Sequence, residues 1–421
     1  LIQPGTGDIR AIAINRTFGN SGYNQTTVNY AVNTPYGASA GVQTGSSSKV
    51  FTLVTALKQG LPFGYHLRVT SPTTVGPYTN CHGGYVPPFP VINAEGPQAA
   101  QTYTIYDGTV QSINAFYATL EQRVGLCNVV RTAASLGMTR ADGVSLLRPD
   151  PHLPRGNNES VDNIPSFTLG SVYVSPMSMA AAYATLAARG VYCKPIAITA
   201  MTNGTGGRFP VESAGCHRVL NKGVADAADY VLQGVLGGAG TANNRGIGIP
   251  AAAKTGTADG GHYAAFAGYT PRLTGYVSVF NPASPTGHGA MIYPRADYRE
   301  VNGLLAAPGQ MFGDNAPGAT WQLTFLRLHL APEAFAAPPA YPYFNLPLTF
   351  KPKKKKSSPS PSPSPSVSVT TTPTPTPSTT PSPTPSATPS QSPRQHPAPH
   401  PAPQRTPPPA AVEEYRSRPV D

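Results

Sequence analysis

The sequence has little of several features that identify common protein classes. Only 12% of its 421 residues are charged, it contains one tryptophan, and its four cysteines form no C-x-x-C pair. The histidines are scattered, and no two of them have the spacing of zinc ligands on a helix. No apolar run is long enough to cross a bilayer, and no signal peptide is present. These absences disfavour a zinc or redox protein and a membrane-spanning domain.

The chain starts at Leu1 rather than at methionine, and its first residues are already strand-like. We therefore expect a fragment whose N-terminal part is missing. Because of this, the lack of an anchor in the sequence does not show that a longer parent protein lacks one.

The net charge of +11 lies largely in the C-terminal part of the chain. The segment from Lys351 to Asp421 has nine lysines and arginines against three acidic residues, and it holds 21 of the 49 prolines. The remaining residues have an ordinary charge and contain no basic helix, zinc-finger spacing or basic-aromatic stripe. We therefore expect no nucleic-acid partner.

Alternating Ser-Pro and Thr-Pro dipeptides dominate this C-terminal segment. Such a sequence buries too little apolar surface to fold and lacks many backbone hydrogen-bond donors. We predict one folded domain over residues 1–345, followed by a disordered tail rich in Pro, Ser, Thr and Lys over residues 346–421.

An even number of cysteines permits two disulfides if the protein is exported. Cys193 and Cys216 flank a predicted hairpin around residues 203–207, so they are candidates for one bond. Cys81 would then pair with Cys127 by elimination alone. Four separate buried thiols are the alternative.

Residue periodicity predicts an α+β layered fold, with an antiparallel sheet flanked by helices and a helical subdomain. Apolar residues at helical spacing follow Ser46 and stop at Gly60, so Ser46 marks the start of a buried helix. Two strands joined by a short turn, residues 264–269 and 274–280, indicate antiparallel pairing. The other predicted elements are a hairpin of residues 1–3 and 9–14, a loop over residues 15–44, helices over about 112–123, 124–136, 176–190 and 224–236, and an N-cap at Ser175.

Ser46 and Lys49 stand three residues apart at the start of the buried helix, so their side chains share a face. A serine hydroxyl is a weak nucleophile and needs an adjacent base. A buried lysine can be that base if desolvation or a second cation lowers its pKa. The backbone N–H of Ser46 could also help to stabilise an oxyanion. Alone, an S-x-x-K pattern is expected about once by chance in a serine-rich chain of this length.

Ser112-Ile113-Asn114 places two polar side chains on either side of an apolar one. If a turn presents them to a cleft, Ser112 can relay a proton to a leaving amine, and Asn114 can hydrogen-bond a substrate amide. The alternative is a helix N-cap followed by a core isoleucine.

Lys254-Thr255-Gly256-Thr257 is predicted to lie on an edge strand. Lys254 could provide the second cation near Lys49, and Gly256 lets another backbone approach closely. Thr255 and Thr257 offer hydroxyls to a substrate carboxylate, and the Thr257 N–H could complete an oxyanion hole. The alternative is an ordinary strand with a glycine bulge.

The three patterns follow one another in a fixed order, and each falls in the local structure that it needs. Together they form the S-x-x-K, S-x-N and K-T-G set of penicillin-binding proteins and serine β-lactamases. Over residues 1–345 the chain resembles the transpeptidase domain of a penicillin-binding protein, and is most similar to the class A (bifunctional) enzymes of actinobacteria.

Other segments also fit this resemblance: Gln43-Thr44-Gly45-Ser46, similar to the Q-P-G-S of the family, Pro165–Gly170, Val174-Ser175-Pro176 and Gly268-Tyr269-Thr270-Pro271. Three residues depart from the pattern. Thr44 replaces the usual proline, Ser48 the usual phenylalanine and Val50 the usual proline. These departures concern local packing and leave the reacting groups unchanged.

The resemblance implies that Ser46 attacks the carbonyl between the two terminal D-alanines of a peptidoglycan stem peptide. D-alanine leaves, and an amine from a neighbouring stem takes the acyl group, which is the reaction of a D,D-transpeptidase. Water as the acceptor would make the protein a D,D-carboxypeptidase. β-Lactam antibiotics mimic the donor and trap Ser46. No metal or organic cofactor is implied.

A serine β-lactamase shares the three motifs and is an alternative. A class A β-lactamase also needs a deacylating glutamate between the second and third motifs. The only glutamate between Glu121 and Glu212 is Glu159, which lacks the surrounding E-x-x-L-N pattern, and Ile113 stands where such enzymes usually have aspartate. A non-catalytic β-lactam sensor or wall-binding domain is an alternative from a different class.

The resemblance places the protein at the extracytoplasmic face of the cell membrane or in the cell wall. It implies a membrane-anchored parent with a transglycosylase domain before Leu1. Lys353–Lys356, at the start of the tail, could contact anionic wall polymers through salt-sensitive attraction. An inert terminus is the alternative.

Overall fold

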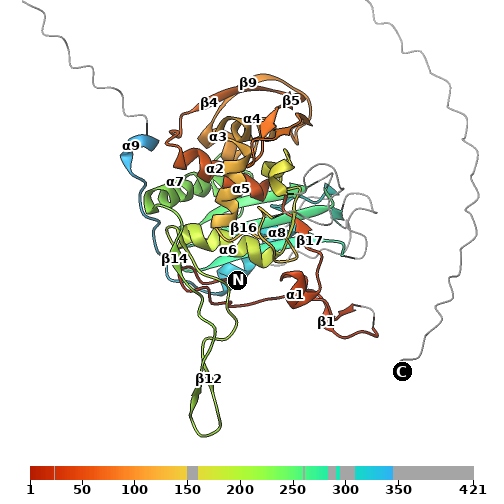
Figure 1. Cartoon of the computed structure of the whole chain (residues 1–421), viewed down its shortest axis with the longest axis vertical. Helices are drawn as coiled ribbons and strands as arrows, with labels where there is room; N and C mark the ends of the chain where they lie inside the picture. The colour runs from red at the N-terminus through yellow and green to blue at the C-terminus, as the bar shows by residue number, and fades with distance from the viewer. Residues whose placement is uncertain (23, 149–159, 259–260, 283–290, 294–308, 345–421) are drawn as a thin grey trace, which may run out of the picture. The chain divides into compact units, whose positions relative to one another are not determined.

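The computed structural model describes residues 1–22, 24–148, 160–258, 261–282, 291–293 and 309–344 (Figure 1). The predicted disordered tail, residues 346–421, lies outside these residues. Within the described part of the chain, no helix combines the length and the apolar character that crossing a membrane requires.

The described residues form helices around one main sheet, with many short strands at the periphery. The helices are α1 (Thr34–Gly37), α2 (Lys49–Lys58), α3 (Ile105–Val110), α4 (Asn114–Val124), α5 (Leu126–Ser135), α6 (Pro176–Ala187), α7 (Lys222–Gln233), α8 (Ala316–Arg327) and α9 (Ala340–Tyr343). Four 3-10 turns are η1 (Gly45–Ser48), η2 (Val161–Asn163), η3 (Phe167–Leu169) and η4 (Gly234–Leu236).

The main sheet consists of β15 (Ala252–Ala258), β16 (Tyr263–Tyr269) and β17 (Thr274–Phe280). The strands are antiparallel, and Lys254 lies opposite Ala267. Among the described residues β15 is an edge strand, so the predicted antiparallel sheet and the predicted place of the Lys254 motif on its edge are confirmed.

Helices cover both faces of this sheet. Because successive strand residues point to opposite sides, neighbouring residues of one strand pack against different helices. On one face, the Trp321 indole of α8 donates to the Gly268 carbonyl at 2.7 Å. A Cβ on Gly268 would lie 2.3 Å from the Trp321 ring, so only glycine permits this packing. Tyr269 points to the other face, where its ring lies 5.9 Å from that of Tyr183 on α6.

The central helix of the remaining part is α2, in which every residue from Lys49 to Leu57 is buried. It packs against α4, α5 and α7. The turn η1 leads into α2, and Gly60, with φ +79°, follows its end, as the sequence predicts. Ser175 caps α6 by accepting the Ser178 N–H at 3.1 Å, which confirms the predicted N-cap.

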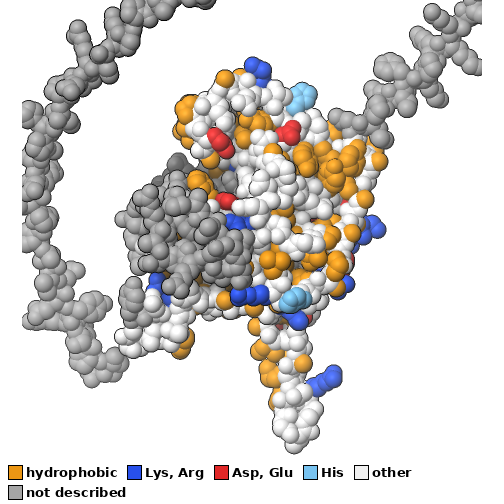
Figure 2. Space-filling model, turned by 180° about the vertical axis from the view of Figure 1, so that it is seen from behind, with side chains coloured by type: hydrophobic (Ala, Val, Ile, Leu, Met, Phe, Trp, Pro, Cys, Tyr) orange, Lys and Arg blue, Asp and Glu red, His pale blue; other side chains and the backbone are white. Residues whose placement is uncertain are grey.

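Short strands pair around this core. They are β1 (Thr17–Phe18), β2 (Gln25–Thr26), β3 (Val42–Gln43), β4 (His66–Ser71), β5 (Thr73–Val75), β6 (Tyr78–Thr79), β7 (Tyr85–Val86), β8 (Phe89–Val91), β9 (Gln98–Thr104), β10 (Tyr173–Val174), β11 (Val191–Tyr192), β12 (Met201–Thr202), β13 (Arg208–Phe209), β14 (His217–Arg218), β18 (Ile292–Tyr293) and β19 (Gly309–Gln310). The hairpin β12–β13 projects from the body (Figure 1), and hydrophobic side chains are visible on its surface (Figure 2). Met201 and Phe209 are exposed hydrophobic residues of this hairpin.

Several predicted boundaries are wrong. The N-terminal hairpin is reduced to a bridge between Ile2 and Ile9, and Ile2 also pairs with Thr274 at the edge of the main sheet. Residues 15–44, predicted as loop, contain α1 and the strands β1, β2 and β3. The helix predicted to start at Ser112 begins at Asn114, because Ser112 has a φ of +59°, which a right-handed helix cannot contain.

Disulfides join Cys81 to Cys127 and Cys193 to Cys216. The first links the segment between β6 and β7 to α5. The second links the start of the β12–β13 region to β14. All four cysteines of the chain are therefore bonded, which excludes the alternative of four separate thiols.

Candidate active site

The turn that carries Ser46 is pressed against the edge strand β15. A Cβ on Gly256 would lie 2.3 Å from the Thr44 carbonyl oxygen, and a Cβ on Gly45 would lie 2.5 Å from the Thr257 carbonyl carbon. Glycine at both positions therefore allows the two backbones to touch. As a result, Gly45, the residue before Ser46, lies against the backbone of Thr257, although the two are far apart in sequence.

Two lysines converge on the hydroxyl of Ser112. Lys49 Nζ lies 2.6 Å from the Ser112 carbonyl oxygen, 3.3 Å from the Ser112 hydroxyl and 2.6 Å from Asn114 Oδ1. Lys254 Nζ lies 2.7 Å from the same Ser112 hydroxyl. The fold thus brings together residues of all three sequence motifs.

Both lysine side chains are fully buried. Burial lowers the pKa of Lys49 well below its ordinary value, the charge of Lys254 lowers it further, and the exposed Glu95 raises it. Burial alone lowers the pKa of Lys254 to about 7. No carboxylate of a described residue hydrogen-bonds either lysine. A neutral amine at Lys49 is a base, as the S-x-x-K pattern requires.

Ser46 itself is half-buried in η1, the turn that leads into α2. In the described part of the chain, no hydrogen bond engages its hydroxyl, while Lys49 directs its hydrogen bonds to Ser112 and Asn114. A hydrogen bond between a nucleophile and its base, here Ser46 and Lys49, is often formed only when substrate is bound. The Ser46 hydroxyl is therefore available to a reacting carbonyl.

Ser112 and Asn114 are held by the backbone before α4. The positive φ of Ser112 is uncommon for a residue with a side chain and turns its hydroxyl toward the lysines. Both polar atoms of the Asn114 amide form hydrogen bonds. Its Nδ2 donates to the Ile92 carbonyl at 2.8 Å, and its Oδ1 accepts from Lys49. Asn114 therefore fixes the Lys49 amine and also ties the motif to the segment after β8.

The hydroxyls of the Lys254 motif have partners of their own. Thr255 Oγ1 lies 2.8 Å from the hydroxyl of Thr241, and Thr257 Oγ1 accepts the Gly313 N–H at 3.2 Å. Thr241 is half-buried on the loop after η4 and belongs to none of the three motifs. No pattern in a single sequence distinguishes this threonine, because its role depends on the contact with β15.

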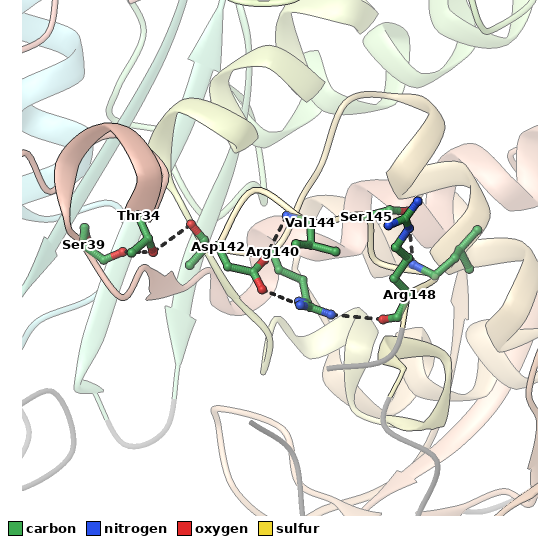
Figure 3. A network of polar contacts seen from close by, with 9 residues as sticks. Thr34, Ser39, Arg140, Asp142, Val144, Ser145 and Arg148 are labelled. Carbon is green, nitrogen blue, oxygen red and sulfur yellow. Dashed lines mark hydrogen bonds and ion pairs between the residues drawn. The ribbon is translucent and has the colours of Figure 1, made fainter. Parts of the chain in front are cut away.

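A polar network that contains no motif residue secures the chain before the Ser46 turn (Figure 3). The Thr34 hydroxyl donates to the carbonyls of Ser39 and Ala141, at 2.6 and 3.1 Å. The buried guanidinium of Arg140 donates to Asp142 and, at 3.0 Å, to the Arg148 carbonyl. The Thr34 contacts tie the segment before β3 to Ala141, and the Arg140 contacts hold the loop that contains Ala141.

A cavity of about 740 Å³ lies away from these motifs, beside the base of the β12–β13 hairpin. Its lining includes Tyr36, Met177, Tyr192 and Ile198 and none of the motif residues. Within the described ranges, no group of three His, Cys, Asp or Glu side chains is arranged to hold a metal ion.

Comparisons with known proteins show which domain family the chain is similar to. The family model described as "Penicillin binding protein transpeptidase domain" matches residues 1–291. Penicillin-binding protein 1A of Mycolicibacterium smegmatis is 34% identical over 254 residues, which cover 58% of this chain and 30% of that protein. Its namesake in Mycobacterium tuberculosis is 32% identical over 273 residues, covering 61% and 31%. The chain thus spans about a third of the length of these curated relatives.

Solved structures also share this fold. The PonA1 protein from Mycobacterium tuberculosis, in complex with penicillin V, is 26% identical with a TM-score of 0.54, covering 76% of this chain and 75% of that chain. Penicillin binding protein 3 from the same organism, complexed with ampicillin, has a TM-score of 0.55 at 22% identity and covers 80% of this chain and 74% of its own. At this identity the similarity shows a shared fold only.

Proposed function

The chain belongs to the penicillin-binding protein transpeptidase domain family, and from this premise we propose that it is a serine D,D-transpeptidase. Its substrates are peptidoglycan stem peptides, which it joins through an acyl-enzyme on Ser46. One observation carries the proposal: a serine hydroxyl, that of Ser112, lies between two buried lysines beside the turn that holds Ser46.

Acylation begins with the neutral amine of Lys49, which takes the proton of the Ser46 hydroxyl. Ser46 Oγ forms a bond to the carbonyl carbon between the two terminal D-alanines. The carbonyl oxygen becomes an oxyanion, which the backbone N–H groups of Ser46 and Thr257 stabilise by hydrogen bonds. The contact between the two backbones at Gly45 and Gly256 supports this pairing of donors.

The tetrahedral intermediate collapses when the carbon–nitrogen bond breaks. Ser112 gives its hydroxyl proton to the departing nitrogen and recovers one from the Lys49 ammonium, to which it is hydrogen-bonded. Lys254, with a pKa of about 7, supports this relay from the other side of Ser112. D-Alanine leaves, and an incoming amine then attacks the ester, forms the new amide and returns the proton to Ser46.

Recognition of the donor peptide falls to the edge strand and to Asn114. Thr255 and Thr257 offer hydroxyls to the terminal carboxylate of the substrate, and Gly256 leaves room for its backbone. The hydroxyl of Thr241 lies 2.8 Å from that of Thr255. Thr241 is therefore placed to donate a further hydrogen bond to the same carboxylate. β-Lactams present a carboxylate and a strained amide to the same groups.

The test is covalent labelling with a fluorescent penicillin, followed by release of D-alanine from a stem-peptide donor in the presence of an amine acceptor. We expect the wild-type chain to label at Ser46, Ser46→Ala to give no adduct, and Ser135→Ala, at the end of α5 and outside the three motifs, to label normally. A wild type that fails to label, or a Ser46→Ala variant that labels equally, would refute the proposal. Continuous turnover of penicillin would indicate a β-lactamase, and D-alanine release without cross-linking a carboxypeptidase.

Glu159, the residue on which a β-lactamase interpretation depends, lies outside the described residues. We infer that the protein acts outside the cytoplasmic membrane, since both disulfides suit an oxidising compartment. A transglycosylase domain and membrane anchor before Leu1, and contacts of Lys353–Lys356 with anionic wall polymers, stay predictions.

A further inference from the structure

Thr44 and Ser48 stand two residues on either side of Ser46, where the resembling motif has proline and phenylalanine. Both side chains are buried, with exposures of 1% and 0%. Their hydroxyl oxygens lie 2.6 Å apart, a normal hydrogen-bond distance for two hydroxyls. The two departures from the motif are therefore one structural feature, in which each buried hydroxyl supplies the partner that the other needs.

Thr44 also joins the turn to two other segments. Its N–H donates to the Gly170 carbonyl at 3.1 Å, a bond that proline cannot make. Its carbonyl oxygen accepts the Ser47 hydroxyl at 2.8 Å and lies directly against Gly256. Thr44 is thus the point at which the turn η1, the segment after η3 and the strand β15 meet.

Ser47, the residue after Ser46, is held by two tyrosines from other elements. Tyr183 on α6 donates its hydroxyl to the Ser47 carbonyl at 2.8 Å. The hydroxyl proton of Ser47 points to the Thr44 carbonyl, so the Tyr276 hydroxyl, 3.0 Å away, donates to Ser47 Oγ. Ser46 therefore lies between neighbours whose hydroxyls are all bonded, which leaves its own hydroxyl for the substrate.

We propose that Thr44 and Ser48 are a positioning pair, whose mutual hydrogen bond holds the turn so that the Ser46 hydroxyl meets the substrate carbonyl at reacting distance. The inference rests on the proposed function and adds two residues to the same site. Neither residue touches the substrate, and both act through the backbone on either side of Ser46. A displacement of about 1 Å at a reacting group can slow a reaction by roughly 10²-fold. A small shift of the turn would therefore lower the acylation rate.

Removing one hydroxyl and removing both have different physical consequences. Thr44→Val leaves the Ser48 hydroxyl buried without its partner, and Ser48→Ala leaves the Thr44 hydroxyl in the same state. An orphaned hydroxyl is unfavourable and pulls the turn toward another partner, whereas removal of both groups with the shape retained can be nearly neutral. The pair therefore predicts strong non-additivity.

The test is a double-mutant cycle in which acylation by a fluorescent penicillin is followed by rapid mixing. The rate at saturating penicillin and the apparent affinity are determined separately. We expect each single variant to acylate about tenfold more slowly with little change in affinity, and the double variant to return to within about threefold of wild type. Thr44→Ser, which keeps the hydroxyl, should restore the rate.

A matched control lies on α2, the helix that follows the turn. The hydroxyls of Thr52 on α2 and Thr168 on η3 are 2.7 Å apart, and both side chains are fully buried. Thr52→Val creates the same kind of orphaned hydroxyl one helical turn beyond Lys49. It should lower the melting temperature while the saturated acylation rate stays at the wild-type value, because it does not flank Ser46.

Three results would overturn the positioning pair: single variants that acylate at the wild-type rate, a double variant whose loss equals the product of the two single losses, or a Thr52→Val variant that acylates as slowly as Thr44→Val. A wild type that forms no adduct would overturn the proposed function itself, so the two failures are distinguishable.

Discussion

Two buried polar clusters of this protein differ in how their charges are compensated. In the first, Lys49 and Lys254 face each other across Ser112, and all their hydrogen-bond partners in the described structure are neutral oxygens. In the second, on α7, Asp226 accepts hydrogen bonds from Nε and Nη2 of Arg189, at 2.8 and 2.7 Å. Asp229 accepts the Tyr269 hydroxyl at 2.6 Å.

The difference separates chemistry from architecture. A buried charge without a counter-ion is unfavourable, so the lysines release their protons at a lower pH than usual and become bases. In the α7 cluster, the bidentate contact with Arg189 gives Asp226 a counter-ion and ties α7 to the segment that follows α6. The lack of a counter-ion therefore distinguishes the two lysines, where we propose that protons move, from the Asp226–Arg189 ion pair, which joins two segments of the fold.

The largest effect should follow from Lys49→Met, which removes the base. We expect the acylation rate to fall by about 10³-fold, since general-base catalysis of this kind contributes 10²- to 10⁴-fold. Labelling with fluorescent penicillin measures it. Lys49→Arg is the matched variant, because it keeps a cation of similar length but does not give up a proton near neutral pH. Wild-type activity in Lys49→Arg would disprove the role of Lys49 as a base.

The second prediction concerns stability in the α7 cluster. Burial raises the pKa of Asp229 from 3.8 in the unfolded chain to about 7 in the fold, despite the Tyr269 hydrogen bond. Between these pH values the folded protein holds a proton that the unfolded chain has lost, so raising the pH from 4 to 7 favours unfolding. Asp229→Asn cannot titrate and should abolish this loss, which amounts to about 3 kcal/mol.

Chemical denaturation of wild type and Asp229→Asn at pH 4, 6 and 8 provides the measurement. The acylation rate at saturating penicillin should be equal in the two proteins. Parallel pH profiles of unfolding free energy would show that Asp229 does not carry the proton, and a slower acylation would end the separation between the two clusters.

The smallest effect should follow from Lys254→Met. The charge of Lys254 contributes to the low pKa of Lys49, so its removal should raise the pKa of Lys49. The base then becomes available only at higher pH, and the acid limb of the rate profile should shift to higher pH, with about a tenfold loss near pH 6. Lys58→Met, an exposed lysine on the same helix as Lys49, should leave the limb in place. An unshifted limb in Lys254→Met would contradict the electrostatic coupling.

Local sequence signals predict much of the framework. Helical spacing after Ser46, the Ser175-Pro176 cap and the two strands joined by the turn at Thr270 all correspond to observed elements, because each depends on neighbours within a few residues. The start of α4 is mispredicted, since the left-handed backbone of Ser112 is imposed by its contacts with lysines from two distant elements.

Other parts of the site carry no local signal. Thr241, Tyr183 and Tyr276 are ordinary loop, helix and strand residues in the sequence, and they gain a role only through contacts with Thr255 or Ser47. The pairing of Cys81 with Cys127 was reachable by elimination alone. In each case the partner lies many residues away in the sequence. Periodicity and capping rules compare residues only a few positions apart, so they do not predict these contacts.

By itself, the sequence determines which chemical groups are available and in which order: a serine with a lysine one helical turn later, a second serine with an asparagine, and a lysine followed by two hydroxyls around a glycine. The tertiary structure alone decides that these groups meet and what state they are in. The Lys254 amine contacts Ser112 across 142 residues of chain, and both lysines lose their affinity for protons because the fold removes them from water without a counter-ion. A pKa is a property of surroundings, and only the fold creates them.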